Sequence, residues 1–270
     1  MSEIEMLEAL PLWSAPPRIA PITGGRTNRN FAVHDGERSY FARIGEDLPH
    51  HRIDRQIERH AVTLAAAAEI TPPLVYARDG LLVTGFIDGT TLHKHQIEDR
   101  HLVAIAALLR RLHQIPAEGL PAFSPRDAAL LYLDMLPDSC LAIERRHLAT
   151  RLSAMPAGEP LCLVHADLIP ENFIESAGVL QVVDWEYAGR GAPETDLASV
   201  IANFDLDERR TSTLLDAYGS YSLGLLAAMR EAQIIREYLW CLVQARHTDE
   251  LGDLIEYTSL CRQRLLEIGL

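Results

Sequence analysis

Two short apolar segments in the second half of the chain each end in a carboxylate, and this pair constrains the fold most. The segment "LCLV" stops at His165 and Asp167, and the segment "VLQVV" stops at Asp184. An unpaired carboxylate is costly to bury, so a buried strand that ends on one delivers it to a cleft, a cap or a metal. A helix cap at Asp167, ahead of Pro170, is the structural alternative.

Asn172 makes the pattern more specific than a cap. It lies five residues after Asp167, a step that lets the loop turn back so that both side chains face one point. Two carboxylates and an amide oxygen are hard donors, which suit Mg²⁺ rather than zinc. Phosphoryl transfer needs such a set: one carboxylate receives the proton of the attacking hydroxyl, and an Asn and a second Asp hold the metal that neutralises the phosphates. Asp167, Asn172 and Asp184 together therefore favour this chemistry over a helix cap.

The first ninety or so residues are strand-rich. Short β-type runs are separated by Gly, Asp and Pro signals, around one helical segment at residues 51–70 that lacks Gly and Pro. Asp35–Gly36 and Asp79–Gly80 suit tight hairpin turns. These features predict a β-rich N-lobe over residues 1–88 with one inserted helix.

From about Gly89 onward the pattern becomes helical. Apolar stripes predict long helices over residues 96–115, 211–247 and 251–268. The two apolar strands that end in acids are the exception in this half. We therefore expect an α+β fold in which residues 89–270 form a larger α-helical C-lobe with the catalytic loop, the metal site and the acceptor site.

Composition limits the partners and the compartment. The net charge of −13 argues against nucleic acid and would steer a cationic substrate toward the chain, although solubility alone also explains it. Membrane insertion is not expected, because the apolar run "LVAIAALLRRLHQI" is broken by Arg110 and Arg111. The acidic N-terminus does not resemble a signal peptide, and the four cysteines show no metal spacing. These features predict a cytoplasmic protein with reduced thiols.

The segment "HADLIPEN" followed by "VVDWE" resembles the catalytic and metal motifs of the aminoglycoside phosphotransferase and choline kinase superfamily. The resemblance extends over nearly the whole chain and implies a protein-kinase-like bilobal fold, with ATP as phosphoryl donor and Mg²⁺ as cofactor. By this resemblance Asp167 is the catalytic carboxylate, and Asn172 and Asp184 are metal ligands. Glu186 supports a second metal, and Asp196 is a structural aspartate that holds the catalytic loop.

The segment "GGRTNRNF" resembles the nucleotide-phosphate loop of choline-kinase-like proteins. Glycines let the backbone approach phosphates, and short polar side chains can bind them. A plain hairpin turn is the alternative for the two glycines, and no Walker motif is present. The residues that the resemblance assigns to the nucleotide are Gly24, Gly25, Thr27, Asn28 and Asn30.

Three further parts of the N-lobe match by resemblance. Arg43 in "YFARIG" stands where protein kinases carry a phosphate-binding Lys, and choline-kinase-like proteins often have Arg there. Glu58 matches the acid that pairs with this cation, although an exposed helical Glu is an equal alternative. The backbone from Val83 to Phe86 resembles the hinge that holds adenine.

The C-terminal helices resemble the choline-kinase segment whose aromatic faces hold a quaternary ammonium. Trp240 and Tyr257 fall at the spacing of that segment, and Tyr187 matches a further aromatic of the site. Glu237 stands where the family commonly has a second Trp. A carboxylate there could bind a cation, or shift preference toward ethanolamine or thiamine. Ordinary core packing is the alternative for Trp240 and Tyr257.

The expected substrate is thus a small-molecule alcohol, cationic as in choline or ethanolamine. Another hydroxyl kinase of the same fold, acting on an aminoglycoside, thiamine or a sugar-like alcohol, is the alternative within the class. A catalytically silent nucleotide- or metabolite-binding protein is the alternative outside it. The presence of Asp167, Asn172 and Asp184 together argues against a catalytically silent protein.

Overall fold

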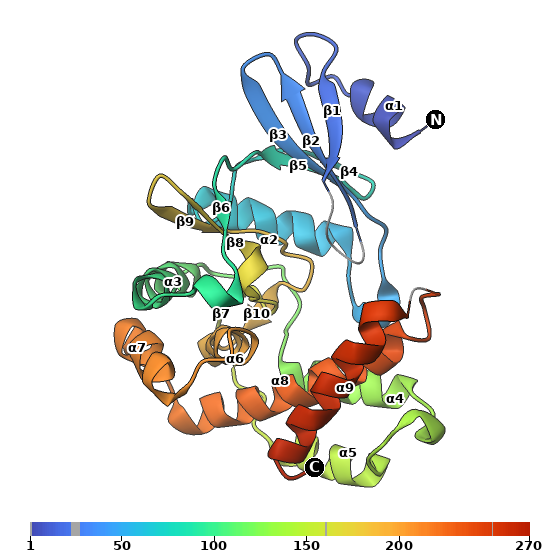
Figure 1. Ribbon diagram of the computed structural model, residues 1–270, viewed down its shortest axis with the longest axis vertical. Helices are drawn as coiled ribbons and strands as arrows, with labels where there is room; N and C mark the ends of the chain where they lie inside the picture. Colours follow the sequence, from blue (N-terminus) through green and yellow to red (C-terminus); the bar gives the residue numbers. More distant parts are fainter. Residues whose placement is uncertain (1, 23–27, 160, 250) are drawn as a thin grey trace. The chain divides into compact units, whose positions relative to one another are not determined.

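The computed structural model describes residues 2–22, 28–159, 161–249 and 251–270 (Figure 1). The chain divides into two compact units. Unit 1 consists of Met1–Thr91 and Asn172–Glu186, and unit 2 consists of Leu92–Glu171 and Tyr187–Leu270. This division differs from the expected lobes 1–88 and 89–270, because the segment Asn172–Glu186 belongs to unit 1.

Unit 1 is built on a five-stranded antiparallel sheet in the order β1-β2-β3-β5-β4. The strands are β1 (Arg18–Ile22), β2 (Arg29–Asp35), β3 (Arg38–Ile44), β4 (Leu74–Arg78) and β5 (Leu81–Gly85). The two expected hairpins are present: Gly36 has φ 62° between β2 and β3, and Asp79 and Gly80 have φ 46° and 79° between β4 and β5. Such left-handed turn residues match the right-handed twist of the flanking strands.

Alternating side chains of the sheet form the core of unit 1. Phe31 and Val33 from β2, Ala42 from β3 and Val83 from β5 are buried with Leu7 of the short helix α1 (Glu3–Glu8). Helix α2 (Arg55–Ala67) begins where the Asp54 side chain accepts hydrogen bonds from the backbone N–H groups of Gln56 and Ile57. This cap satisfies two of the amide groups that have no partner at a helix start.

The segment Asn172–Glu186 joins unit 1 through backbone pairing. β8 (Phe173–Ser176) and β9 (Val179–Val182) form a hairpin, and β8 pairs with β6 (Thr90–Thr91). The Val182 N–H also donates to the Ile70 carbonyl at 3.0 Å. These bonds explain why residues far along the chain belong with the first ninety.

Unit 2 is mainly helical. Its helices are α3 (Asp99–Leu112), α4 (Pro125–Met135), α5 (Arg145–Ala154), α6 (Pro193–Asn203), α7 (Glu208–Tyr218), α8 (Leu223–Gln244) and α9 (Gly252–Glu267). The strands β7 (Cys162–Val164) and β10 (Gly189–Gly191) pair antiparallel. Short 3-10 turns occur at Pro49–His51 in unit 1, at Lys94–Gln96 and Asp138–Cys140 in unit 2, and at Pro170–Asn172 where the chain passes between units.

The core of unit 2 lies among α4, α5, α8 and α9. Tyr132, Leu148, Leu239 and Cys261 are among its buried residues, one from each of these helices. The predicted helix over residues 211–247 is two helices, because α7 ends at Gly219, whose φ of 99° a helix cannot continue. No helix in the described part of the chain is long and apolar enough to cross a membrane.

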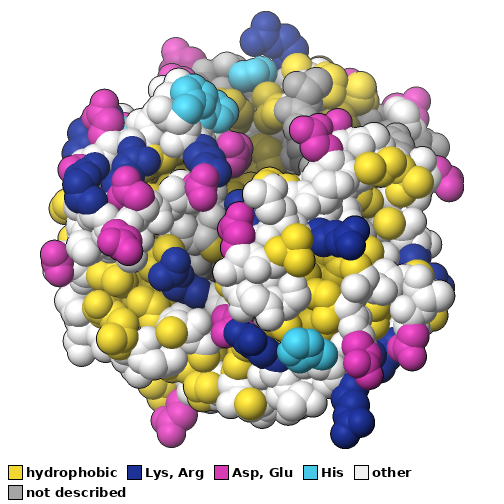
Figure 2. All heavy atoms as spheres, turned by 60° about the horizontal axis from the view of Figure 1, so that its bottom comes forward, with side chains coloured by type: hydrophobic (Ala, Val, Ile, Leu, Met, Phe, Trp, Pro, Cys, Tyr) yellow, Lys and Arg dark blue, Asp and Glu magenta, His cyan; other side chains and the backbone are white. Residues whose placement is uncertain are grey.

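Charged side chains of both signs are scattered over the face drawn in Figure 2, with hydrophobic side chains between them. The acidic excess of the chain, −13 in formal net charge, is therefore interspersed with basic groups on this face. An interspersed surface of this kind favours solubility rather than a single-sign field.

Candidate functional site

The β8–β9 hairpin brings two predicted metal ligands together. The Val183 N–H donates to the Asn172 carbonyl at 2.9 Å, so Asn172 and Asp184 are close neighbours at the open end of the hairpin. Asp184 has a φ of 70°, a left-handed conformation that is uncommon for a residue with a side chain. Its side chain is 40% exposed, so its carboxylate can still receive a ligand.

The donor set fits Mg²⁺ as a shared ion. Among the described residues, no group of three or more His, Cys, Asp or Glu side chains could hold a metal by itself. Mg²⁺ in phosphoryl-transfer sites is commonly held by one or two protein oxygens together with phosphates and water. Asn172 and Asp184 supply oxygens of that kind, so they would hold the ion jointly with a nucleotide.

Arg43 lies beside Asp184. It extends from β3 opposite Asn30 of β2, and its Nη1 lies 3.1 Å from the Asp184 Oδ1, while its Nη2 pairs with the Glu58 Oε1. Burial would lower the pKa of Arg43, but the charges of Glu58 and Asp184 outweigh it and raise that pKa. The predicted Arg43–Glu58 pair is therefore present, and Glu58 is 1% exposed rather than a solvated helical Glu.

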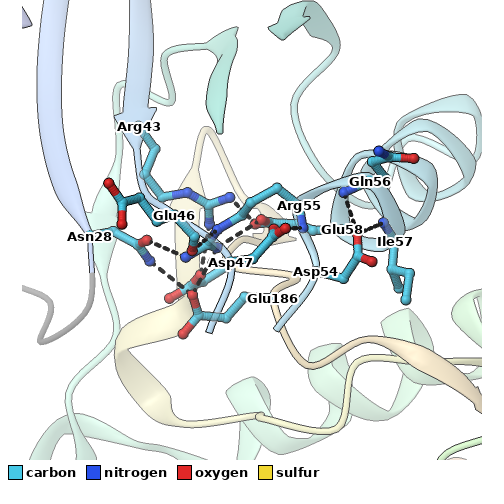
Figure 3. Close-up of polar contacts among 11 residues, drawn as sticks. Asn28, Arg43, Glu46, Asp47, Asp54, Arg55, Gln56, Ile57, Glu58 and Glu186 are labelled. Atoms are coloured by element: carbon cyan, nitrogen blue, oxygen red, sulfur yellow. Dashed lines mark hydrogen bonds and ion pairs between the residues drawn. The ribbon is translucent and has the colours of Figure 1, made fainter. Parts of the chain in front are cut away.

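Arg55, which the sequence analysis did not single out, links this pair to Glu186 (Figure 3). Its Nη1 donates to the Glu58 Oε2 at 2.9 Å and to the Glu186 Oε2 at 3.1 Å. The same Glu186 oxygen accepts a hydrogen bond from the Asn28 Nδ2 at 2.9 Å. The only sequence signal for Arg55 is its position three residues before Glu58 on one helix face.

The other residues predicted to bind the nucleotide differ in their surroundings, and some lie outside the described part of the chain. Gly24, Gly25 and Thr27 lie outside the described residues. Val83 is buried inside β5 and pairs with both neighbouring strands, whereas Phe86 follows the strand, is 40% exposed and donates its N–H to the Ser39 carbonyl. The end of β5 is thus the open part of the predicted hinge, and Val83 lies in the sheet interior.

In unit 2, Asp196 holds the loop that carries Asp167. The Asp196 Oδ2 accepts from the His165 N–H at 2.9 Å, and its Oδ1 accepts from the Ala166 N–H at 2.8 Å. Asp196 lies in the first turn of α6 and also contacts the His113 Nε2 at 3.2 Å. These two backbone bonds stabilise Ala166 at φ 66°, so Asp196 has the loop-holding position that the sequence indicated.

Arg236 supports the same loop from helix α8. Its Nη1 donates to the Ala166 carbonyl at 3.0 Å. Its guanidinium lies 5.3 Å from the ring centroid of Phe123 and 4.9 Å from that of Tyr187. The sequence gives no signal for Arg236, because a buried Arg inside an amphipathic helix resembles any other helical Arg.

The predicted acceptor residues lie close together in unit 2. The Trp240 Nε1 donates to the Tyr187 hydroxyl at 2.9 Å, and Trp240 and Tyr257 both pack against the core of this unit. Burial and the nearby Glu237 raise the pKa of the Tyr257 hydroxyl. The ring of Tyr187 already has Arg236 over it, so the protein itself supplies one cation to this aromatic group.

Glu237 has protein partners of its own. Its Oε2 lies 3.1 Å from the Arg264 Nη1 of α9, and its Oε1 accepts from the Gln233 Nε2 at 3.3 Å. Burial raises the pKa of Glu237 more than the charges of Arg264 and Arg236 lower it. The resemblance predicted that Glu237 faces the substrate, and the sequence gives no signal for its partner Arg264.

The features of each unit indicate the class of the protein. Unit 1 has an antiparallel sheet with an Arg–Glu pair, and unit 2 has an Asp-bearing loop held by a buried aspartate; each is a feature of kinase-like phosphotransferases. The chain matches the model of the phosphotransferase enzyme family over residues 18–232, and it belongs to that family.

Two named relatives match most of the chain. The chain is 24% identical over 252 residues to Protein LicA of Haemophilus influenzae, covering 85% of this chain and 74% of that protein. It is 27% identical over 243 residues to thiamine kinase of Salmonella typhi, covering 86% of this chain and 78% of that protein.

Solved structures agree on the fold. The structure of choline kinase LicA from Streptococcus pneumoniae has a TM-score of 0.77 at 22% identity, covering 93% of each chain. A LicA structure in complex with AMP has a TM-score of 0.73 at 22% identity, covering 93% of this chain and 94% of that one. The protein-kinase-like α+β fold is confirmed, and solved choline kinase structures share it.

Proposed function

We propose that this protein transfers the terminal phosphoryl group of ATP, with Mg²⁺, to the hydroxyl of a small-molecule alcohol. The observation that carries the proposal is the pair of hydrogen bonds that Asp196 accepts from backbone N–H groups of the loop bearing Asp167. A general base has to be held in place to accept a hydroxyl proton at the moment of attack. AMP in the related LicA structure supports nucleotide use.

The roles follow from the chemistry of each side chain. Asp167 accepts the proton of the acceptor hydroxyl. Asn172 and Asp184 hold Mg²⁺, which neutralises phosphate charge when bound. Arg43, fixed by Glu58 and Asp184, contributes a fixed positive charge beside the metal ligands.

For the acceptor, we propose an amino alcohol of the choline type. The support is the relative named choline kinase and the group of Tyr187, Trp240 and Tyr257 in unit 2. Because the Glu237 carboxylate is engaged by Arg264 and Gln233, it is poorly suited to bind the N–H groups of a primary ammonium. A quaternary nitrogen has no N–H to satisfy, so the geometry favours choline over ethanolamine.

Thiamine is the second candidate. Its thiazolium nitrogen is also quaternary, so the engaged carboxylate of Glu237 favours it for the same reason. The relative named thiamine kinase adds weight to this candidate. An aminoglycoside carries several primary ammonium groups and is favoured less.

The test is ADP release from ATP and Mg²⁺ with choline, thiamine, ethanolamine and an aminoglycoside as acceptors. We expect turnover with choline or thiamine above the other two. Asp167→Asn should lower kcat by about 10²–10⁴-fold while nucleotide binding persists. Nucleotide binding without turnover on any acceptor would instead favour a catalytically silent binding protein.

A neutral analogue separates charge recognition from shape. In 3,3-dimethylbutan-1-ol a carbon replaces the choline nitrogen, so the hydroxyl and the shape remain and the charge is lost. If the rings hold a cation, this alcohol should be the poorer substrate, and Trp240→Ala should raise the KM for choline about 2- to 30-fold without changing the KM for ATP. Equal turnover of the two alcohols would show that the rings are ordinary core.

A further inference from the structure

The side chain of Arg55 lies at the centre of the polar group drawn in Figure 3, and none of the proposed roles above uses it. The side chain of Arg55 is 8% exposed. A buried guanidinium is retained only where its donors are matched, because an unmatched one is costly to desolvate. The partners of Arg55 therefore indicate what it does.

Four different segments of unit 1 meet at this one side chain. Besides Glu58 and Glu186, Arg55 donates from Nη2 to the Asn28 Oδ1 at 2.7 Å and from Nε to the Glu46 carbonyl at 2.9 Å. Its backbone N–H donates to the Asp47 Oδ1 at 2.8 Å. Arg55 thus joins the residue before β2, the loop after β3, helix α2 and the end of the segment that carries Asp184.

Asn28 and Glu186 are also joined to each other, by the Asn28 Nδ2 donating to the Glu186 Oε2 at 2.9 Å. Arg55, Asn28 and Glu186 therefore form a closed triangle of hydrogen bonds. Asn28 belongs to the segment predicted to bind phosphate, and Glu186 lies two residues after Asp184. A closed triangle fixes the two segments against each other more firmly than a single contact would.

The backbone of Gly45 packs directly against the triangle. A Cβ added at Gly45 would lie 2.2 Å from the Asn28 Oδ1 and 2.8 Å from the Arg55 Nη2. Gly45 does not have a positive φ, so its need for glycine comes from this close approach and not from backbone conformation. A methyl group at this position would separate Asn28 from Arg55 without removing either.

We propose that Arg55 is a positioning residue of the nucleotide site, which holds Asn28 and Glu186 in the places that phosphate and metal binding require. This proposal rests on the proposed nucleotide-dependent activity. In it, Arg55 and Asn28 hold the Glu186 carboxylate in place through its Oε2. Loss of Arg55 then weakens nucleotide binding, while Asp167 and the acceptor residues of unit 2 are unaffected.

The experiment compares Arg55→Gln, Arg55→Lys and Gly45→Ala with wild type. The KM for ATP, the kcat, and the direct binding of Mg²⁺–ADP to folded protein are measured. We expect Arg55→Gln to raise the KM for ATP about tenfold or more, because hydrogen bonds to charged groups are lost, with a smaller change in kcat. Arg55→Lys keeps the charge but not the fork and should recover only part of the loss.

Two matched controls accompany these variants. Arg59→Gln changes an exposed Arg of the same helix, and Gly224→Ala adds a methyl group where nothing lies within 4 Å. Both should leave the KM for ATP unchanged. Gly45→Ala should raise the KM for ATP in the same direction, and the double variant should be no worse than Arg55→Gln alone, because the Asn28–Arg55 contact is already lost in Arg55→Gln.

The outcomes separate this proposal from the proposed function. If wild type turns over and Asp167→Asn does not, but Arg55→Gln keeps the wild-type KM, the positioning role is wrong and the function stands. A lower melting temperature with unchanged KM, or additive effects of Gly45→Ala and Arg55→Gln, likewise overturns it by showing a structural role only. If wild type neither binds Mg²⁺–ADP nor turns over ATP, the proposed function fails and the positioning role fails with it.

Discussion

Glu237 is a residue on which burial and ion pairing act in opposite directions. Burial raises its pKa, and the charges of Arg264 and Arg236 only partly offset this effect. The folded protein therefore holds this proton to a higher pH than the unfolded chain, whose Glu side chains titrate near 4.5. The stability that follows from proton binding is fully present below that value and is lost as the pH rises through the folded pKa.

We predict that wild type loses stability relative to Glu237→Gln as the pH rises from about 5 to about 7.5. Urea unfolding of both proteins at the two pH values measures the difference. Glu256→Gln, on an exposed position of α9, is the control and should track wild type. A gap between wild type and Glu237→Gln that is constant with pH would show that burial does not govern this carboxyl.

Asn172 and Asp184 give a prediction about metal. Each offers one oxygen ligand to a hard cation, so Asp184→Ala and Asn172→Ala should both raise the Mg²⁺ concentration needed for half-maximal rate. The larger effect is expected from Asp184, because it removes a charge. A Mg²⁺ titration of the rate is the measurement, and unchanged half-activating concentrations in both variants would remove these residues from the metal site.

Residues that terminate apolar strands could be found from the sequence, whereas residues that hold them could not. Asp184 can be identified because an unpaired carboxylate is costly to bury, so one that follows a buried strand needs a functional or structural reason. No local sequence feature marks Arg55, Arg236 and Arg264, since each lies on a helix and Arg is common in helices. Their partners are distant in the chain, as for Arg55 and Glu186, which are 131 residues apart.

At the scale of elements, the loop after β7 is fixed from two helices. Asp196 of α6 bonds two of its N–H groups, and Arg236 of α8 bonds the Ala166 carbonyl. The loop contains a non-glycine residue, Ala166, in a left-handed conformation that costs free energy. Such a conformation persists only where the surrounding bonds specify it, so both helices are needed to place Asp167.

We predict that Arg236→Lys lowers kcat by up to about 10²-fold, because loss of the planar guanidinium and of its ring contacts lets the loop shift. The KM for ATP should change little, because the Arg236 contacts lie in unit 2. Steady-state kinetics with saturating acceptor separates the two constants. Arg230→Lys, at an exposed position of the same helix, should keep the wild-type kcat.

Local periodicity predicted helices well where one face is apolar and capping or turn residues mark the ends. Helices α2, α3 and α9 lie within their predicted ranges, and trimming at the start of α2 follows from the Asp54 cap. The break between α7 and α8 is marked by "GSYS" at residues 219–222, which is poor in helix formers, and it was missed because apolar helical patterns continue on both sides of it. Strand β8 was missed because Phe173–Ser176 has too few alternating residues to be distinguished from loop.

For the whole molecule, the change from a strand-rich to a helix-rich pattern near residue 89 predicted two contiguous lobes. Composition reports what each segment contains and not which segments pair. The segment Asn172–Glu186 belongs to unit 1 through bonds to β6 and to Ile70, and no local pattern encodes those partners. Unit 1 is thus assembled from two stretches of chain separated by eighty residues of unit 2, Leu92–Glu171.

The discontinuous composition of unit 1 leads to a prediction that contiguous lobes do not make. Amides of β2, β3 and α2 and amides of residues 172–186 should gain protection from hydrogen exchange together when Mg²⁺–ADP binds. At about 100 times Kd the nucleotide adds roughly 2.7 kcal/mol to any opening that abolishes binding, which slows exchange through that opening about 100-fold. Amides of α5 and α9 should change little when the nucleotide binds.

The acceptor and a metal-ligand variant are the controls. Choline or thiamine alone should protect α8 and α9, where Trp240 and Tyr257 lie. Asp184→Ala should abolish the nucleotide effect on both stretches of unit 1. If residues 172–186 respond to the acceptor and not to the nucleotide, they act with the C-terminal helices, and the nucleotide site has been placed on the wrong unit.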